Sequence, residues 1–257
     1  MRFYTISGGL DSSVIAALCQ EKYTGVPLIG ISIPMSSTNE HKEQAKRIGK
    51  KYCSAFEQFD EWEEKYFDTD EDEIQDVINT VSLTDRIANK AEFEIKSFPK
   101  KILNGNIKAR LRMITLYDLA RKTNGIVLST DNLSEFNMGF WTINGDVGDY
   151  GPIQNIWKGL ELPTIAKLLN IPTDIIKQKP SDGLMVTEDN TDEAQLGAPY
   201  KHVDAIMIVF LNKKDYKKEW KKIKEDKIVI DIVNRYKNTK FKRDGTTNIT
   251  RKQLGIK

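Results

Sequence analysis

A glycine turn between a short apolar run and a helical segment constrains the fold more than any other feature of this sequence. The apolar run extends from Phe3 to Ile6, the turn reads Ser7-Gly8-Gly9-Leu10-Asp11-Ser12-Ser13, and helical spacing of apolar residues follows from Ser12 to Tyr23. Short apolar runs of this kind are typical of buried parallel strands. A glycine turn at the start of a helix points free backbone N–H groups at an anion. The sequence therefore predicts a phosphate-binding loop after the first strand.

Strand-like and helical segments alternate along the rest of the chain. Strands are predicted at Leu28 to Ile33 and at Ile126 to Thr130. Helices are predicted at Asn39 to Tyr52, Asn106 to Thr123, Pro163 to Leu169, Val203 to Leu211 and Asp215 to Tyr236, with a loop confined by Pro172 and Pro180. This alternation predicts an α/β fold, a doubly wound parallel sheet with helices on both faces. Without an internal repeat or a low-complexity linker, residues 1–257 are predicted to form a single domain.

Composition excludes several classes of protein. With 39% hydrophobic residues and a formal net charge of +2, the chain is neither disordered nor a uniformly basic nucleic-acid coat. No apolar run approaches the roughly 18 to 20 residues that span a bilayer, and Met1 leads straight into a strand-like run. We therefore expect a cytoplasmic protein without a membrane partner. Cys19 and Cys53 fit neither a zinc site nor a disulfide framework.

Two segments carry strongly uneven charge. Eleven acids and one base lie between Glu57 and Asp76, interleaved with aromatic residues, and this pattern predicts a solvated helix face over an aromatic core rather than a metal cage. Sixteen Lys or Arg and six acids lie between Asn212 and Lys257. Because acids interrupt the lysines at helical spacing, the segment is interpreted mainly as an exposed helix side, and nucleic acid is an unlikely partner.

The composition of the glycine turn specifies the kind of phosphate. No Lys follows the glycines, so the turn is not a Walker A loop. The serines at 7, 12 and 13 supply hydroxyl donors, whereas Asp11 would repel a phosphate unless Mg²⁺ lay between them. An Mg²⁺-pyrophosphate complex accounts for the whole set, although an isolated Ser-Gly-Gly is more often an ordinary capped turn.

The run SGGLDSS resembles the pyrophosphate loop of the ATP pyrophosphatases, which cleave ATP between the α and β phosphates. Five later segments resemble, in order and spacing, the ammonia-dependent NAD synthetases of this superfamily. They are GNIKARLRMITLYDLA (Gly105 to Ala120), STDNLSEFNMGFWTINGD (Ser129 to Asp146), GPIQNIWK (Gly151 to Lys158), KPSDGL (Lys179 to Leu184) and TDEAQLGAPYKHVD (Thr191 to Asp204).

This resemblance implies a ligase that forms a C–N bond. In such an enzyme ATP adenylates the nicotinate carboxylate of deamido-NAD, pyrophosphate leaves, and ammonia displaces AMP to give NAD. The implied cofactors are ATP and Mg²⁺, and the implied partners are deamido-NAD, ammonia and a second copy of the chain in a homodimer. A glutaminase would not fit in the 257 residues, so ammonia is expected to arrive free or from a separate protein.

The resemblance also assigns roles to individual residues. Asp11 and Glu135 resemble the Mg²⁺ ligands, and Lys158 resembles a phosphate-binding and catalytic cation. The expected ATP contacts are Ser7, Gly8, Gly9, Leu10, Asp11, Ser12, Thr130, Lys158 and Ser181. The expected deamido-NAD contacts are Arg110, Asp149, Phe241 and Lys242. Asp149, or the neighbouring Asp146, is expected to face the nicotinate end and to hold ammonium or accept its proton.

Departures from the family pattern gather on the dinucleotide side. Ile143 and Phe241 replace a Lys and a His, and Ser32 replaces an Arg. The first strand is expected to begin at Phe3, without the amino-terminal helical segment that the family uses at its dimer interface. These changes keep two rival interpretations open. One is a related ATP pyrophosphatase that adenylates a different carboxylate or a tRNA base, and the other is a nucleotide-binding module without turnover. Retention of the metal, phosphate and acyl-transfer residues argues against the second rival.

Overall fold

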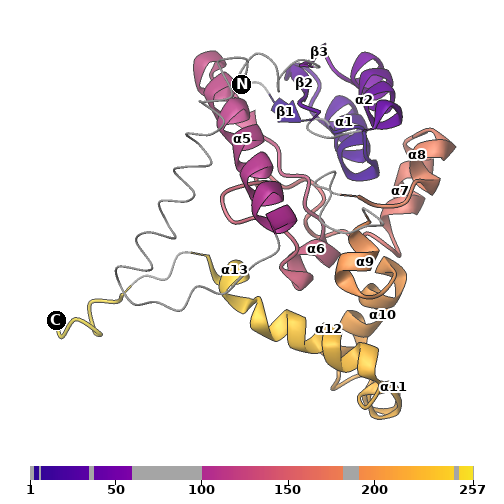
Figure 1. The fold of residues 1–257 in the computed structure, drawn as a ribbon, viewed down its shortest axis with the longest axis vertical. Coiled ribbons are helices and arrows are strands. Elements are labelled where there is room, and N and C mark those ends of the chain that lie inside the picture. Colours follow the sequence, from indigo (N-terminus) through magenta and orange to yellow (C-terminus); the bar gives the residue numbers. More distant parts are fainter. Residues whose placement is uncertain are drawn as a thin grey trace.

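The computed structural model describes residues 3–5, 7–34, 38–59, 100–181, 191–245 and 249–256 (Figure 1). Its strands are β1 (Phe3–Thr5), β2 (Leu28–Ser32), β3 (Ala55–Gln58) and β4 (Ile126–Val127). Its helices are α1 (Leu10–Lys22), α2 (Asn39–Tyr52), α5 (Lys100–Thr123), α6 (Leu133–Met138), α7 (Leu162–Leu168), α8 (Thr173–Lys177), α9 (Asp192–Leu196), α10 (Tyr200–Leu211), α11 (Lys217–Ile223), α12 (Lys227–Asn238) and α13 (Lys240–Asp244).

The four strands form a parallel sheet in the order β3-β2-β1-β4. Phe3 pairs with Leu28 on one side and with Ile126 on the other. The chain therefore builds outward from β1 to β3 and then crosses back to place β4 against the opposite edge of β1. In doubly wound sheets a ligand binds at the carboxyl end of the strands where the order reverses in this way. The loop that leaves β1 lies at that position.

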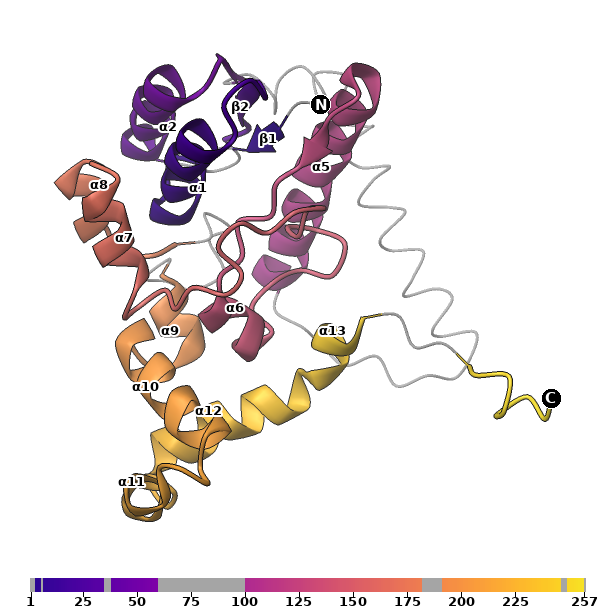
Figure 2. The ribbon, with the colours of Figure 1, turned by 180° about the vertical axis from the view of Figure 1, so that it is seen from behind.

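Helices cover both faces of the sheet, which confirms the predicted fold class. Leu28 packs with α1 and α2 on one face, whereas Ile29 and Ile31 pack with α5 on the other. This alternation follows from the two-residue repeat of a strand. Figure 2 shows the same arrangement from behind, with α5 separated from α1 and α2 by the strands.

A second group of helices lies away from the strands (Figures 1 and 2). The apolar sides of α6, α10 and α12 meet around Met138, Val203, Met207 and Ile232, all of which are buried. This helical cluster carries several residues of the site described below. Among the described residues, no helix is both long and apolar enough to cross a membrane.

The prediction of one continuous helix from Asp215 to Tyr236 is wrong, because the structure has two helices there, α11 and α12. Asp226 adopts an extended backbone and its carboxylate accepts from the N–H groups of Ile228, at 2.8 Å, and Val229, at 3.4 Å. A side chain that satisfies the free N–H groups of a first turn starts a new helix.

Two further segments differ from the sequence predictions. The chain between Pro172 and Pro180 contains the helix α8, since the fully buried Ile175 anchors one turn against the core. The acidic segment begins in the strand β3 rather than in a helix, because Phe56 packs under the α2 side of the sheet. The predicted helix face beyond Phe59 lies outside the described residues.

Candidate active site

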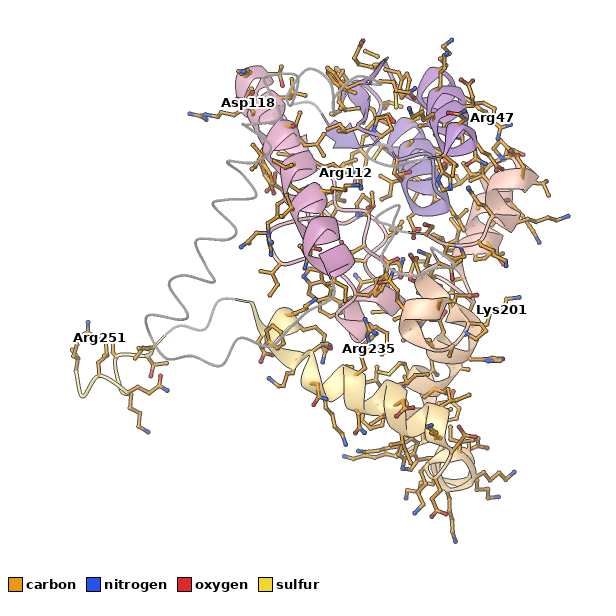
Figure 3. All side chains as sticks on the ribbon, viewed as in Figure 1. Arg47, Arg112, Asp118, Lys201, Arg235 and Arg251 are labelled. Carbon is orange, nitrogen blue, oxygen red and sulfur yellow. The ribbon has the colours of Figure 1, made fainter. Side chains whose placement is uncertain are left out.

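A cavity of about 940 Å³ opens beside the loop that follows β1. Its lining is built from this loop and from residues of α5, α6, α9, α10 and α12. Its lining includes Ser7, Gly9, Leu10, Asp11, Arg112, Thr130, Glu135, Phe140, Trp141, Asp146, Lys158, Ser181, Asp192, Tyr200, Arg235 and Lys242. Figure 3 shows two of these side chains, Arg112 on α5 and Arg235 between α12 and α6.

The loop after β1 requires a glycine at position 8. Gly8 has a φ of +83°, and a Cβ there would lie 2.6 Å from the carbonyl oxygen of His41 and 2.7 Å from the nitrogen of Ala45. The start of α2 therefore presses directly on the loop. Ser12 fixes the other side, because its hydroxyl accepts from the N–H of Ser7 at 3.2 Å and donates to the carbonyl of Gly9 at 3.2 Å.

Lys158 is buried and lies among three carboxylates. Its Nζ is 2.7 Å from Glu135 Oε1, 3.1 Å from Asp11 Oδ2 and 3.3 Å from Asp192 Oδ2. The ammonium also lies over the ring of Tyr200, with 4.6 Å between Nζ and the ring centroid, and forms a cation–π contact with it. These contacts join the loop after β1 to α6, α9 and α10.

Neighbouring polar groups orient the carboxylates. The Tyr200 hydroxyl lies 3.1 Å from Asp192 Oδ2 and 3.3 Å from Glu135 Oε1. The Asn132 amide donates to Asp11 Oδ1 at 2.8 Å. Asn132 also caps α6, and it forms a reciprocal capping box with Glu135. The sequence Asp-Asn-Leu-Ser-Glu thus starts a helix and aims an acid into the cavity in the same turn.

Burial and crowding change the protonation of this group. The pKa of Glu135 is raised to about 8: burial is the largest cause, the Lys158 ammonium acts in the opposite direction, and the neighbouring carboxylates of Asp11 and Asp192 add to the increase. Burial alone would lower the pKa of Lys158, but the carboxylates of Asp11 and Glu135 outweigh it and hold that pKa well above its ordinary value. One ammonium is therefore shared among three acidic groups. A further cation bound in the cavity would be stabilised by the remaining negative charge.

Asp11 and Glu135 suit a magnesium ion bound together with a substrate. Mg²⁺ typically takes one or two protein carboxylates and completes its shell with phosphate oxygens and water. Among the described residues, no three His, Cys, Asp or Glu side chains form a metal cage. The donor set fits an ion that arrives with a phosphate rather than one held by protein alone.

The far wall of the cavity combines aromatic rings with two cations. The Lys242 ammonium donates to the carbonyls of Gly139, at 2.8 Å, and Trp141. The Arg235 guanidinium donates to the carbonyls of Met138, at 3.1 Å, and Gln195, at 3.0 Å. Burial lowers the pKa of both cations. Backbone carbonyls, rather than carboxylates, hold the positive charge here.

Residues 3–246 match the family model of NAD synthase. The chain is 34% identical to the NH(3)-dependent NAD(+) synthetase of Methanocaldococcus jannaschii, over 80% of this chain and 71% of the relative. It is 35% identical to the enzyme of the same name from Finegoldia magna, over 86% of this chain and 81% of the relative. The chain belongs to the NAD synthase family. It is therefore a ligase that forms C–N bonds, as the sequence predicts.

A solved structure gives the same placement. The NMN synthetase of Francisella tularensis superposes with a TM-score of 0.70 at 25% identity, over 96% of this chain and 88% of the other. This agreement confirms the family resemblance stated from the sequence and the fold that it implies.

The structure brings most of the predicted NAD synthase site residues to one cavity. Ser7, Gly9, Leu10, Asp11, Thr130, Glu135, Asp146, Lys158, Ser181 and Lys242 contribute to its lining, and Gly8 and Ser12 shape the loop beside it. Their individual roles stay predictions.

Three predicted residues lie outside the described lining of the cavity. Arg110 is exposed on α5 and its Nε donates to the carbonyl of Ile143 at 3.3 Å. The Asp149 carboxylate accepts from the Tyr117 hydroxyl at 2.8 Å and from the backbone N–H of Val127 at 3.2 Å. Phe241 is 59% exposed on α13. In this structure Arg110 and Asp149 therefore stabilise neighbouring backbone instead of facing the cavity.

Four residues of the site received no role from the sequence: Asn132, Asp192, Tyr200 and Arg112. All four lie inside segments that resemble the family, and the first three lie at the starts of α6, α9 and α10. Arg112 extends from the buried side of α5 and its Nε donates to the carbonyl of Ile33 at 3.2 Å. Ala109 and Met113 mark the buried side of α5. Their spacing in the sequence is the signal that could have indicated Arg112, rather than Arg110, as the arginine that faces the cavity.

Proposed function

We propose that this chain converts deamido-NAD to NAD with ammonia, using ATP and Mg²⁺, through an acyl-adenylate that forms with release of pyrophosphate. The observation that carries the proposal is the contact of Lys158 with Asp11 and Glu135 beside the loop of Ser7 to Ser12. A cation, two potential metal ligands and a phosphate-binding loop are what cleavage between the α and β phosphates requires.

The phosphate side of the cavity would bind and stabilise the leaving pyrophosphate. Bound Mg²⁺ would neutralise phosphate charge between Asp11 and Glu135. Ser7 is exposed and contributes to the lining of the cavity, and the N-terminus of α1 offers a favourable dipole. Lys158 would place its ammonium against the same oxygens and would exchange some of its carboxylate contacts for phosphate ones.

Asp146 is the better candidate for the carboxylate that faces ammonia. It contributes to the cavity lining, and its Oδ1 accepts from the N–H of Thr142 at 2.7 Å, which fixes its direction. Both oxygens of Asp149 instead serve Tyr117 and Val127. Ammonium held at Asp146 would first give up a proton to become ammonia, whose lone pair would attack the acyl carbon. The bond from that carbon to the phosphate oxygen of AMP would break, AMP would leave, and the nitrogen would lose a further proton to give the amide.

The far wall with Lys242 and Arg235, here called the acceptor wall, would face the acceptor, and the wall with Lys158, Asp11, Glu135 and Asp192 is called the phosphate wall. Two substitutions outside the described lining favour a second candidate as well, a mononucleotide with the same nicotinate carboxylate. Ile143 is 43% exposed and Phe241 is 59% exposed, so two positions that carry a cation and an imidazole in the family pattern here offer no charge. A dinucleotide needs partners for an additional phosphate, whereas a mononucleotide does not. The neighbour from Francisella tularensis is named for the synthesis of NMN, a mononucleotide.

One assay separates these possibilities. The purified chain is incubated with ATP, Mg²⁺ and ammonium, with either deamido-NAD or nicotinate mononucleotide, and amide product and pyrophosphate are measured together. We expect equal amounts of both products with deamido-NAD, and no product when glutamine replaces ammonium. Faster turnover of the mononucleotide would establish the second candidate. Failure to release pyrophosphate with either acceptor would contradict both. The homodimer and the single domain stay predictions, to be checked by light scattering and limited proteolysis.

A further inference from the structure

Asp204 is a fully buried carboxylate that does not line the cavity. It lies on α10 and accepts three hydrogen bonds. Its Oδ1 accepts from the Ser134 hydroxyl at 2.5 Å, and its Oδ2 accepts from the backbone N–H groups of Gly159, at 2.7 Å, and Leu160, at 3.1 Å. A buried carboxylate is costly unless its oxygens are satisfied in this way. All three donors belong to segments that carry active-site residues.

Ser134 extends this network to Lys158. While its hydroxyl donates to Asp204, the same oxygen accepts from the backbone N–H of Lys158 at 2.9 Å. Ser134 also directly precedes Glu135 on α6. The Asp204 carboxylate therefore holds the backbone on both sides of the Lys158–Glu135 ion pair.

The same helix contacts the other end of the lysine. Tyr200 lies one turn before Asp204 on α10, and residues four apart share a helix face. Its ring lies under the Lys158 ammonium. Gly159 permits this approach, because a Cβ there would lie 2.4 Å from the backbone nitrogen of Lys201, at the start of α10 in Figure 3.

We propose that Asp204 is a positioning residue for Lys158: through Ser134 and the turn at Gly159 it sets where the ammonium sits among Asp11, Glu135 and Asp192. The proposal rests on the proposed function only for the role of Lys158 in turnover. A carboxylate that merely filled the core would contribute stability and leave the lysine in place. The two roles predict different outcomes for a variant that keeps the shape of Asp204.

Chemical labelling of lysines tests the positioning itself and needs no substrate. In Asp204→Asn the amide oxygen can still accept from the two backbone N–H groups. The amide NH2 group, however, would face the Ser134 hydroxyl, so that two donors would oppose each other there. The variant and the wild type are treated briefly with acetic anhydride and analysed by peptide mass spectrometry. We expect the acylation of Lys158 to rise at least tenfold, while that of Lys242, in the same cavity, changes less than twofold. Unchanged Lys158 labelling, or an equal rise at both lysines, would overturn the proposal.

The matched control is Asp226→Asn. Asp226 also accepts from two backbone N–H groups, but it caps α12 and is exposed. This variant should leave both lysines as in the wild type. If it raises Lys158 labelling as much as Asp204→Asn does, the effect belongs to general loosening and the proposal fails.

Kinetics then link position to turnover. Asp204→Asn should lower kcat for pyrophosphate release at least tenfold and change KM for ATP less than threefold, since the loop after β1 is untouched. Ser134→Ala should act similarly, Ser134→Thr should recover most of the rate by keeping the hydroxyl, and the double variant Ser134→Ala with Asp204→Asn should lose little more than either alone. Normal kcat in an Asp204→Asn protein with exposed Lys158 would overturn the proposal. A wild type without pyrophosphate release would instead contradict the proposed function and leave the labelling result standing.

Discussion

The two walls of the cavity hold their positive charges in different ways. At the phosphate wall, Lys158 contacts the side chains of Asp11, Glu135 and Asp192. At the acceptor wall, Lys242 and Arg235 donate to backbone carbonyls. A carboxylate can rotate away or bind a metal ion, whereas a carbonyl in a folded loop stays in place. The phosphate wall is thus arranged to exchange partners during a reaction, and the acceptor wall is arranged to keep its shape.

The two sides of the site also differ in how closely their residues follow the family pattern. The phosphate wall keeps each charged residue that the family pattern leads us to expect. The two positions at which a cation and an imidazole are replaced, Ile143 and Phe241, are exposed and lie outside the described lining of the cavity. Under the proposed function, chemistry at the α phosphorus would depend on the first wall and recognition of the acceptor on the second. The departures from the family pattern would then affect specificity rather than the chemical step.

Replacement of Lys158 should give the largest effect. In Lys158→Met the buried Asp192 and the partly buried Asp11 and Glu135 lose their ammonium, and removal of one partner of a buried ion pair typically costs about 3 to 5 kcal/mol of folding free energy. We expect pyrophosphate release to fall by roughly a thousandfold, a loss of about 4 kcal/mol in transition-state stabilisation. Lys242→Met is the matched variant at the acceptor wall, and it should raise the KM of the acceptor more than it lowers kcat. Equal losses from both variants would show that the walls do not differ as described.

Gly8→Ala should follow in size. The new Cβ would sit at a positive φ and would meet the backbone of His41 and Ala45 below 3 Å. Left-handed backbone at a non-glycine residue costs on the order of 1 to 3 kcal/mol before the clash is counted. We expect denaturant unfolding to show a loss of about 2 kcal/mol or more, with ATP binding abolished by calorimetry. Gly9→Ala is the control, because its Cβ would meet only the Ser7 hydroxyl, at 3.6 Å. A tolerated Gly8→Ala would contradict this loop geometry.

Glu135 should make stability depend on pH. Its pKa is about 8 in the folded chain, against an ordinary value of 4.5, so the folded state binds this proton more tightly. The resulting stabilisation is complete below pH 4.5 and is lost as the pH rises through 8. In that interval the free energy of unfolding should fall by up to about 1.4 kcal/mol per pH unit. Urea titrations from pH 5 to 8 measure this slope. Glu135→Gln should flatten it, and an unchanged slope in that variant would assign the effect to other groups.

Local sequence patterns predicted the phosphate wall better than the contacts that complete it. A strand, two glycines and a helix start lie within a few residues of one another, so the loop after β1 could be inferred directly, and the bounds predicted for α2 agree with the structure. Asp192 and Tyr200 meet Lys158 only after α9 and α10 have packed beside α6 in the helical cluster. No local periodicity encodes such a meeting, and the resemblance gave these two residues no role.

The helix α5 shows that the extent of a helix can be predicted from the sequence while the side that faces the cavity cannot. Its extent was largely predicted, yet the choice between two arginines two positions apart depends on which side of the helix faces the sheet. The packing of Met113 and Ala120 against Val127 decides that Arg112 faces the cavity and that Arg110 faces solvent. Neighbours two apart on a helix point to different sides, so a small error in phase exchanges their roles.

Restoring the family's charged groups at Ile143 and Phe241 should have a smaller effect than the other substitutions, confined to binding of the acceptor. Ile143→Lys with Phe241→His would restore an ammonium and an imidazole at two exposed positions. A charge-assisted hydrogen bond is typically worth about 1.5 to 3 kcal/mol when its partner is desolvated, and exposure reduces this, so we expect about a tenfold gain in kcat/KM for deamido-NAD. The gain should appear in KM with kcat unchanged, which is the signature of uniform binding. Nicotinate mononucleotide should gain less, since it lacks the additional phosphate that the new groups would meet. If kcat/KM rises equally for both acceptors, or for neither, Ile143 and Phe241 do not determine which acceptor is used. Specificity would then depend on cations that line the cavity, namely Arg112, Arg235 and Lys242.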